Sequence, residues 1–258
     1  MKALNGSIKK TFTILEHFTP QKSEWGVTEL AKVLGANKST VYRFLSDMQQ
    51  LGILRQDPAS EKYSLGLKLF ELGNRVHIQS AFVEKTHPEL AKVALEITET
   101  VHLAILKSNQ VFYVDKVESP QGLKMSNHIG TYGPAHATSL GKVLLAFTLP
   151  EHDDFRRNNM LADTTLQAYT EHTITDTESL LRELAEVRSQ GYAIDREEFE
   201  IGLICVAVPI FNRQNEIVAS LSASGPANRF KEEEVENYVA ILRSGATAIQ
   251  QNIGFFKL

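Results

Sequence analysis

Apolar residues recur three or four positions apart over the first fifty residues, which is the spacing of amphipathic helices. The pattern predicts three helices, over residues 7–18, 27–34 and 38–50. Gly35 is expected to end the second helix, and Asn37 is expected to cap the third. The apolar positions of the first helix are Ile8, Phe12, Leu15 and Phe18.

The period of the pattern changes after Gly52, which stops the third helix. The segment ILRQDPASEKYSLG predicts two short strands around a polar turn at residues 57–60. Residues 65–99 have a mostly helical pattern with a break near residue 79, and we place the linker between two domains there.

From residue 101 onward, apolar and polar residues alternate as they do in strands. VHLAILK and QVFYVDKV flank a turn at Ser108 and Asn109, which predicts a hairpin. The other strand candidates are LKMSN, YAID, LICVAVPIF and EIVASLSAS.

Helical patterns interleave with these strands. TSLGKVLLAFT predicts one helix, a capping box of Thr175 and Glu178 begins another that Gly191 ends, and a final helix covers about 230–252. The inner face of that final helix carries Val235, Val239, Leu242 and Ile249. Strict strand–helix alternation is absent, so we predict an α+β domain with a mainly antiparallel sheet flanked by helices.

Composition and charge narrow the class of protein. The chain is 43% hydrophobic and 22% charged, as soluble globular proteins are, and no apolar run or N-terminal signal suggests a membrane or secretion, so a cytoplasmic location is expected. Residues 1–80 carry eleven Lys or Arg and seven Asp or Glu, a net charge of +4, whereas the remainder is acidic. A basic front favours contact with phosphate.

The segment from Val27 to Phe44 has the spacing of a helix-turn-helix. Gly35 lies in the turn, where a positive φ is easily adopted only without a Cβ. The expected inward positions are Leu30, Ala31, Leu34, Ala36, Val41, Phe44, Leu45 and Met48. The opposite face of the second helix would then enter the DNA major groove. The alternative is a trihelical packing module whose charged face is merely solvated.

The chemistry of that face suggests individual roles. Arg43 suits a two-bond contact with guanine, Lys38 suits phosphate, and Ser39 and Thr40 near the helix N-terminus suit phosphate or a base edge. The full set of candidate DNA-binding residues is Lys38, Ser39, Thr40, Tyr42, Arg43, Ser46 and, beside the turn of the hairpin, Arg55 and Lys62.

Three stretches of the sequence resemble the isocitrate lyase regulator (IclR) family. They are VTELAKVLGANKSTVYRFLSDMQQLGIL followed by SEKYSLGLKLFELG, then PAHATSLGKVLLAF, then GYAIDREEFEIGLICVAVPIFN with IVASLSASGPANRF. The resemblance implies a winged helix-turn-helix domain, a linker helix that mediates dimerisation, and a GAF-like effector-binding domain. We place these at residues 1–64, 65–79 and 80–258.

The resemblance also implies partners. Family members are dimers, or dimers of dimers, on palindromic double-stranded operator DNA, and they bind small organic or aromatic acids that switch transcription. KSTVYRFL and SEKYSLGLKLFELG look most like the subgroup of 2-keto-3-deoxygluconate repressors, which points to carbohydrate acid metabolism. We therefore expect a repressor released by a small carboxylate effector, 2-keto-3-deoxygluconate or a related keto sugar acid, and we expect no cofactor and no membrane contact.

Carried over by motif, the effector pocket of the family would be lined by Met125, Ser139, Leu140, Asp195, Cys205, Ser222 and Ser224. A helix that begins near Thr138 offers unpaired N–H groups and a positive dipole end to a carboxylate. Ser222 and Ser224 are two apart on a strand and share a face, and Asp195 suits the hydroxyl groups of a sugar acid.

These residues also have purely structural interpretations. Cys205 suits a buried structural thiol, the serine pair suits a solvent-facing strand pattern, and Asp195 suits a cap or an ion pair with Arg196. His136 favours a structural hydrogen bond over a metal ligand. His102 and His128 lack a metal-type partner at short spacing, so no metal site is expected.

Two other functions compete with the regulator. A redox sensor that switches through Cys205 would need a partner from another subunit or a small-molecule cap, because this is the only cysteine. An enzyme with a Cys or Ser nucleophile would need an adjacent base and oxyanion donors, and no G-x-S-x-G, Walker, G-x-G-x-x-G or H-E-x-x-H motif is present. We therefore expect no enzymatic activity.

Overall fold

The structure, a computed structural model, describes residues 6–73, 77–121, 128–149 and 166–253. The chain divides into two compact units, Met1–His77 and Ile78–Leu258, which are considered separately below. The division lies two residues before the boundary that we placed from the sequence. None of the described helices is long and apolar enough to cross a membrane.

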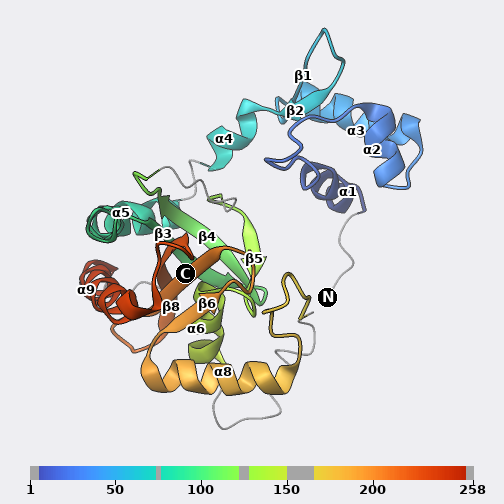
Figure 1. Ribbon diagram of the computed structural model, residues 1–258. Helices are drawn as coiled ribbons and strands as arrows, with labels where there is room; N and C mark the ends of the chain where they lie inside the picture. Colours follow the sequence, from blue (N-terminus) through green and yellow to red (C-terminus); the bar gives the residue numbers. More distant parts are fainter. Residues whose placement is uncertain (1–5, 74–76, 122–127, 150–165, 254–258) are drawn as a thin grey trace. The chain divides into compact units, whose positions relative to one another are not determined.

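The first unit is a trihelical bundle followed by a two-stranded antiparallel ribbon (Figure 1). Its elements are α1 (Gly6–Leu15), α2 (Val27–Val33), α3 (Lys38–Gln50), β1 (Leu54–Gln56), β2 (Tyr63–Leu65) and α4 (Leu67–Gly73). Leu30, Val41, Leu45 and Met48 are buried in its core, as the helical spacing predicted. The two strands β1 and β2 flank the turn at residues 57–60, as predicted.

The structure contradicts one prediction for this unit, the inward position of Ala36, and adds detail to two others. Ile8 and Phe12 are 52% and 61% exposed, because only the end of α1, at Ile14, is buried in the core of this unit. Ala36 is exposed because it belongs to the turn after Gly35 rather than to a helix face. Asn37 does hold the N-cap position of α3, with an extended backbone, but its side chain makes no capping hydrogen bond.

The second unit is built on a six-stranded sheet in which every neighbouring pair is antiparallel, in the order β5-β4-β3-β8-β7-β6. Its strands are β3 (Thr100–Lys107), β4 (Gln110–Val117), β5 (Tyr132–Pro134), β6 (Ala193–Arg196), β7 (Leu203–Phe211) and β8 (Ile217–Pro226). Its helices are α5 (His77–Ile97), α6 (Ser139–Thr148), α8 (Thr177–Gln190), a 3-10 turn at Glu232–Glu234 and α9 (Val235–Ile253). The predicted α+β class with an antiparallel sheet is confirmed.

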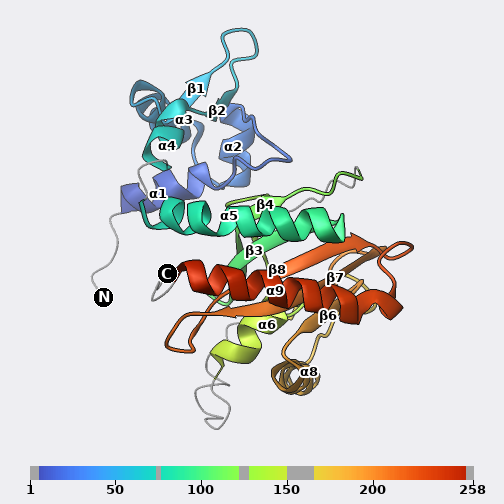
Figure 2. The same cartoon turned by 90° about the vertical axis from the view of Figure 1, so that its left-hand side faces the viewer.

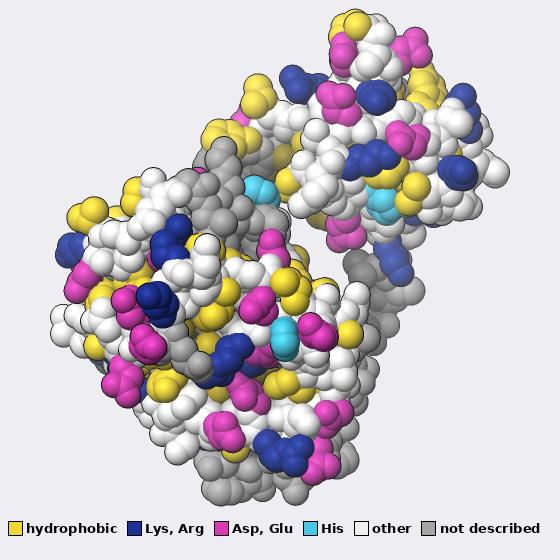
Figure 3. All heavy atoms as spheres, in the orientation of Figure 1, with side chains coloured by type: hydrophobic (Ala, Val, Ile, Leu, Met, Phe, Trp, Pro, Cys, Tyr) yellow, Lys and Arg dark blue, Asp and Glu magenta, His cyan; other side chains and the backbone are white. Residues whose placement is uncertain are grey.

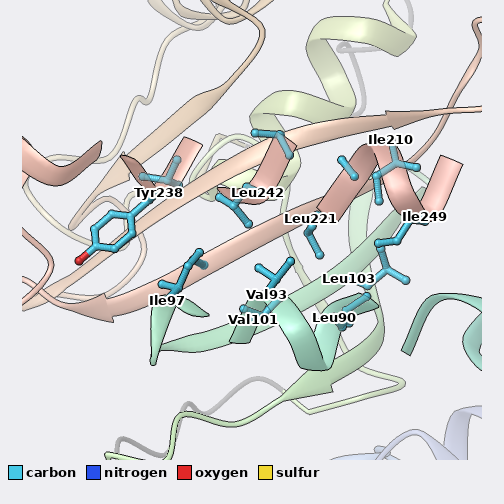
Figure 4. Close-up of a cluster of buried hydrophobic side chains, with 14 of the residues drawn as sticks. Leu90, Val93, Ile97, Val101, Leu103, Ile210, Leu221, Tyr238, Leu242 and Ile249 are labelled. Atoms are coloured by element: carbon cyan, nitrogen blue, oxygen red, sulfur yellow. The ribbon is translucent and has the colours of Figure 1, made fainter. Parts of the chain in front are cut away.

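Helices cover both faces of this sheet. Figure 2 shows α5 and α9 side by side over one face, and Figure 4 shows their side chains meeting those of β3 and β8, with Val93, Leu103, Leu221 and Leu242 in one buried cluster. The predicted inner face of α9 is buried at Val235, Val239, Leu242 and Ile249. On the other face α6 packs against the strands, and α8 packs against α6.

Local details of the second unit differ from expectation. The capping residue of α8 is Asp176, whose Oδ1 accepts from the Ser179 N–H at 2.8 Å, and not Thr175. Helix α5 runs unbroken through residue 79, so the break predicted there is wrong; α4 ends at Gly73, and residues 74–76 lie outside the described residues. Strand β5 was not predicted, and the candidate strand LKMSN, at residues 123–127, lies outside the described residues.

Candidate functional sites

The first candidate site is the outer face of α3. Lys38, Ser39, Tyr42 and Arg43 are exposed, whereas the opposite side of the helix is buried. Thr40 and Ser46 are half-buried at the margin of this face. On the view in Figure 3, Lys and Arg side chains of the first unit are interspersed with acidic ones rather than merged into one patch. Recognition of a polyanion would therefore depend on particular side chains on α3 and the hairpin.

The hairpin β1–β2 is tied to the core of its unit. The backbones of Trp25 and Tyr63 exchange two hydrogen bonds of 2.9 and 2.8 Å, and Tyr63 is 1% exposed. Arg55 Nε donates to Ser64 Oγ at 2.8 Å across the ribbon, so this side chain lies along the hairpin rather than projecting freely. Lys62 is exposed next to the turn. At that turn, hydrogen bonds from the Ala59 N–H and the Ser60 hydroxyl lower the pKa of Asp57.

The second candidate site is a cavity between the sheet and the start of α6, here called the effector cavity. Its lining residues are His102, Tyr113, Thr138, Ser139, Leu140, Asp195, Phe199, Leu203, Cys205, Ser222 and Ser224. Six of the seven residues expected from the motifs are therefore brought together. The seventh, Met125, lies outside the described residues. The free volume is about 20 Å³, which is room for about one water molecule.

Strand register explains why these side chains converge. Asp195 pairs with Cys205, Cys205 pairs with Ser224, and Ser222 pairs with both Ala207 and His102. Because side chains alternate along a strand, this row points to one face of the sheet, the one that α6 covers. Asp195, Ser222 and Ser224 are 1–3% exposed, so the alternative of a solvent-facing serine pattern is wrong.

Burial sets the protonation of the acidic groups in the cavity. Burial raises the pKa of Asp195 to about 7. The hydrogen bond that Asp195 Oδ1 accepts from the Glu198 N–H at 2.8 Å lowers the pKa, but by less than burial raises it. Burial, with Asp195 nearby, also raises the pKa of the Cys205 thiol well above its usual range. A buried thiol that stays protonated is a poor nucleophile and a poor redox sensor, which favours the structural interpretation of Cys205.

The N-terminus of α6 forms one wall of the cavity. Thr138 Oγ1 accepts from the Gly141 N–H at 3.2 Å and donates to the Pro134 carbonyl at 2.8 Å, which fixes the start of the helix. A Cβ at Gly141 would lie 2.3 Å from backbone atoms of Ala135, so only glycine permits this close approach. The first-turn N–H groups, those of Ser139 and Leu140 among them, have no acceptor within the helix and suit an anion.

A buried lysine, Lys142, contacts the segment around Asp195, and the sequence analysis did not identify it. Lys142 is 1% exposed, and its ammonium donates to Glu183 Oε1 at 2.9 Å, Glu198 Oε1 at 2.6 Å and the Ile194 carbonyl at 3.0 Å. The signal was present in TSLGKVLLAFT, where Lys142 is the only charged residue of an apolar helix.

Two histidines of this unit have different surroundings. His136 Nε2 lies 3.0 Å from the Gln167 carbonyl, in agreement with the expected structural hydrogen bond. His102 lines the cavity, and its ring lies 5.4 Å from that of Tyr113. Burial, and to a smaller extent the positive charge of Lys116, lower the pKa of His102 to about 3. Across the described ranges, no group of three or more His, Cys, Asp or Glu side chains is placed to hold a metal ion.

Comparison with known proteins identifies both units of the chain. Residues 7–58 match the IclR helix-turn-helix domain, and residues 76–251 match the C-terminal domain of the bacterial transcriptional regulator IclR. The HTH-type transcriptional regulator KdgR of Escherichia coli is 41% identical over 249 residues, covering 96% of this chain and 93% of its own length. KdgR of Dickeya chrysanthemi is 40% identical over 249 residues, covering 96% and 80%.

Solved structures show the same fold. An IclR homologue complexed with 4-hydroxybenzoate, from Microbacterium hydrocarbonoxydans, has a TM-score of 0.82 at 27% identity, covering 96% of this chain and 98% of that one. The Thermotoga maritima IclR has a TM-score of 0.74 at 32% identity, covering 96% and 99%. Since relatives along nearly the whole chain are named as transcriptional regulators, the protein is a regulator and not an enzyme. The chain belongs to the IclR family of bacterial transcriptional regulators.

Proposed function

We propose that the protein is a repressor that binds a palindromic operator as a dimer and releases it when a small keto sugar acid, such as 2-keto-3-deoxygluconate, enters the effector cavity. The two KdgR relatives, at 40% and 41% identity, support a transcriptional regulator of this subgroup. The effector class rests on the resemblance of KSTVYRFL and SEKYSLGLKLFELG to the 2-keto-3-deoxygluconate repressors. The observation that carries the proposal is the buried polar row of Asp195, Ser222 and Ser224 beside the N-terminus of α6.

The roles on DNA follow from the geometry of the first unit. Arg43, exposed on α3, reads guanine in the major groove, while Tyr42 and Ser46 flank it. Phosphate contacts come from the N-terminal end of α3, through Lys38, Ser39 and Thr40. Arg55 and Lys62 add contacts from the hairpin. Two such units in a dimer place two recognition helices on the half-sites of a palindrome.

The roles in the effector cavity follow from charge. The carboxylate of the acid lies at the first turn of α6, where N–H groups of Ser139 and Leu140 and the helix dipole favour an anion. Asp195, Ser222 and Ser224 bond to the oxygen atoms along the carbon chain of the acid. The polar content of this lining favours a hydroxylated acid over a purely apolar one.

The size of the cavity supplies the switch. A space of about 20 Å³ cannot hold a six-carbon acid, so the acid binds only an arrangement in which the lining, Leu140 and Phe199 included, has moved apart. A ligand shifts an equilibrium only through different affinities for its two states, and a closed and an open cavity differ strongly in affinity. A tenfold change in operator affinity needs about 1.4 kcal/mol of coupling.

The test is fluorescence anisotropy of labelled intergenic DNA taken from beside the chain's own gene. The protein is bound first, and 2-keto-3-deoxygluconate, pyruvate, glyoxylate and an aromatic acid are then titrated separately. Selective release by 2-keto-3-deoxygluconate supports the proposal, and Asp195→Ala should keep operator binding while losing the response. Release by another acid alone would replace the effector, and absence of salt-sensitive binding would refute the DNA role.

A further inference from the structure

The effector cavity contains two polar atoms whose hydrogen-bonding capacity is unused. Among the described residues, the buried side-chain atoms without a hydrogen-bond partner are His102 Nε2, Ser222 Oγ and Glu198 Oε2. The first two belong to side chains that line the same cavity, and His102 and Ser222 stand opposite each other in the register of β3 and β8. Buried polar groups are normally hydrogen-bonded, so a pair of such exceptions in one cavity calls for an explanation.

Their surroundings hold the imidazole neutral and in place. His102 is 1% exposed, and Lys116 stands opposite it on β4. Burial and the nearby positive charge of Lys116 both disfavour an imidazolium, so the pKa of His102 is lowered to about 3. The ring also packs edge-on against the Tyr113 ring at 5.4 Å, which restricts its rotation. A neutral imidazole nitrogen donates or accepts according to its tautomer, and a hydroxyl can do either, so the pair can offer one donor and one acceptor, the complement of an alcohol.

We propose that His102 and Ser222 form a charge-neutral subsite that binds a hydroxyl group on the carbon chain of the effector, and so select hydroxylated acids over unsubstituted acids of the same length. The proposal rests on the proposed function, because it assumes that an acid enters this cavity. The carboxylate belongs to the N-terminus of α6, where the donors are backbone N–H groups, and the His102–Ser222 pair serves the uncharged part of the molecule. The pair has no partner in the closed cavity because its partner is the effector.

Selectivity of this kind has a physical basis. A site that buries hydrogen-bonding groups rejects a ligand without the matching group, because these groups then stay unpaired away from water. An apolar acid of the same length would fill the space and leave His102 Nε2 and Ser222 Oγ unsatisfied. Replacing His102 by an apolar side chain removes the penalty and with it the discrimination.

The experiment compares two six-carbon acids, 2-keto-3-deoxygluconate and 2-oxohexanoate, which share the keto acid end and differ in their hydroxyl groups. Their affinities for the full-length protein are measured by calorimetry, for the unmodified chain and for His102→Met, His102→Gln and Ser222→Ala. The unmodified chain should prefer the hydroxylated acid by roughly a hundredfold or more. His102→Met and Ser222→Ala should reduce this ratio by roughly tenfold each, and His102→Gln, which keeps a polar atom near the Nε2 position, should restore most of it.

Thermal unfolding without ligand gives a second, independent readout. His102→Met replaces an unpartnered polar atom by an apolar side chain, so the melting temperature of the ligand-free protein should rise or stay unchanged, whereas a histidine needed for structure would make it fall. An unchanged affinity ratio in His102→Met, or equal binding of both acids by the unmodified chain, would overturn the subsite while leaving the regulator intact. Binding of neither acid would overturn the subsite and the proposed effector class together.

Discussion

The buried carboxyl of Asp195 makes the stability of the second unit depend on pH with an unusual sign. Burial raises its pKa in the folded chain to about 7, from 3.8. Between these two values the folded chain holds a proton that the unfolded chain has released, so the free energy of unfolding decreases as the pH rises. The contribution of Asp195 to the free energy of unfolding is therefore largest below about pH 4, where the carboxyl is protonated in both states. It is lost as the pH rises through about 7.

The magnitude follows from the same values. Each pKa unit corresponds to about 1.36 kcal/mol, so a difference of about three units costs the folded chain about 4 kcal/mol at neutral pH. Asp195→Asn should remove this cost, because the amide is neutral at every pH. Its oxygen can still accept the hydrogen bond that the Glu198 N–H donates to Asp195 at 2.8 Å in the unmodified chain. The stability difference between variant and unmodified chain should therefore grow by about 4 kcal/mol from about pH 4 to about pH 7.5.

The assay is urea unfolding of the full chain, followed by far-ultraviolet circular dichroism across this pH range. His102 titrates with the opposite sign, because its pKa is lowered, but it is present in both proteins and cancels in the difference. Trp25 is the only tryptophan and lies in the first unit, so the fluorescence transition should be the same in both proteins. A stability difference that is constant with pH would refute the argument, since it would mean that the folded carboxyl ionises at its ordinary pKa.

Three further changes test other parts of the molecule. Arg43→Ala should weaken operator binding by roughly 1–3 kcal/mol in anisotropy titrations, with a smaller loss on scrambled DNA; an equal loss on both would contradict a base contact. Gly141→Ala should lower the melting temperature, because its Cβ would lie 2.3 Å from backbone atoms, whereas Gly73→Ala, with nothing within 4 Å, should not. Leu221→Ala, at a fully buried position, should cost about 2–5 kcal/mol in urea unfolding, and the 77% exposed Leu95→Ala should cost less than about 0.5 kcal/mol.

Periodicity predicted elements well where one face of an element meets a continuous core. The inner face of α9 was predicted because α9 packs along its whole length, as its buried residues from Val235 to Ile253 show. Ile8 and Phe12 also have helical spacing and lie on α1, yet both are exposed, because an apolar stripe does not reveal how much of it is covered. A strand as short as β5, with the sequence Tyr-Gly-Pro, has too few residues for an alternating pattern to appear.

The effector cavity was partly predictable for a different reason. Motif resemblance located Asp195, Ser222 and the start of α6, because each lies within a recognisable stretch of sequence. His102 was considered only as a metal ligand, and what singles it out is the lack of a partner for Nε2, which depends on every neighbour in three dimensions. Lys142 was overlooked because its counter-charges come from segments about 40 and 56 residues further along the chain.

The serine pair on β8 bears on how regulators of this kind diversify. β8 is hydrogen-bonded to β3 on one side and β7 on the other, so its backbone path is held along most of its length. The space beside Ser222 and Ser224 therefore comes from small side chains, while Leu221 and Ala223, each of which directly precedes one of these serines, pack on the opposite face. Under the proposed function, exchanging one of these serines for alanine or threonine would alter the chemical signal that is sensed while the backbone pairing of β8 is kept. Under the same proposal, a duplicated gene would acquire a new inducer by such single substitutions, because the DNA-binding unit is a separate compact unit that they do not touch.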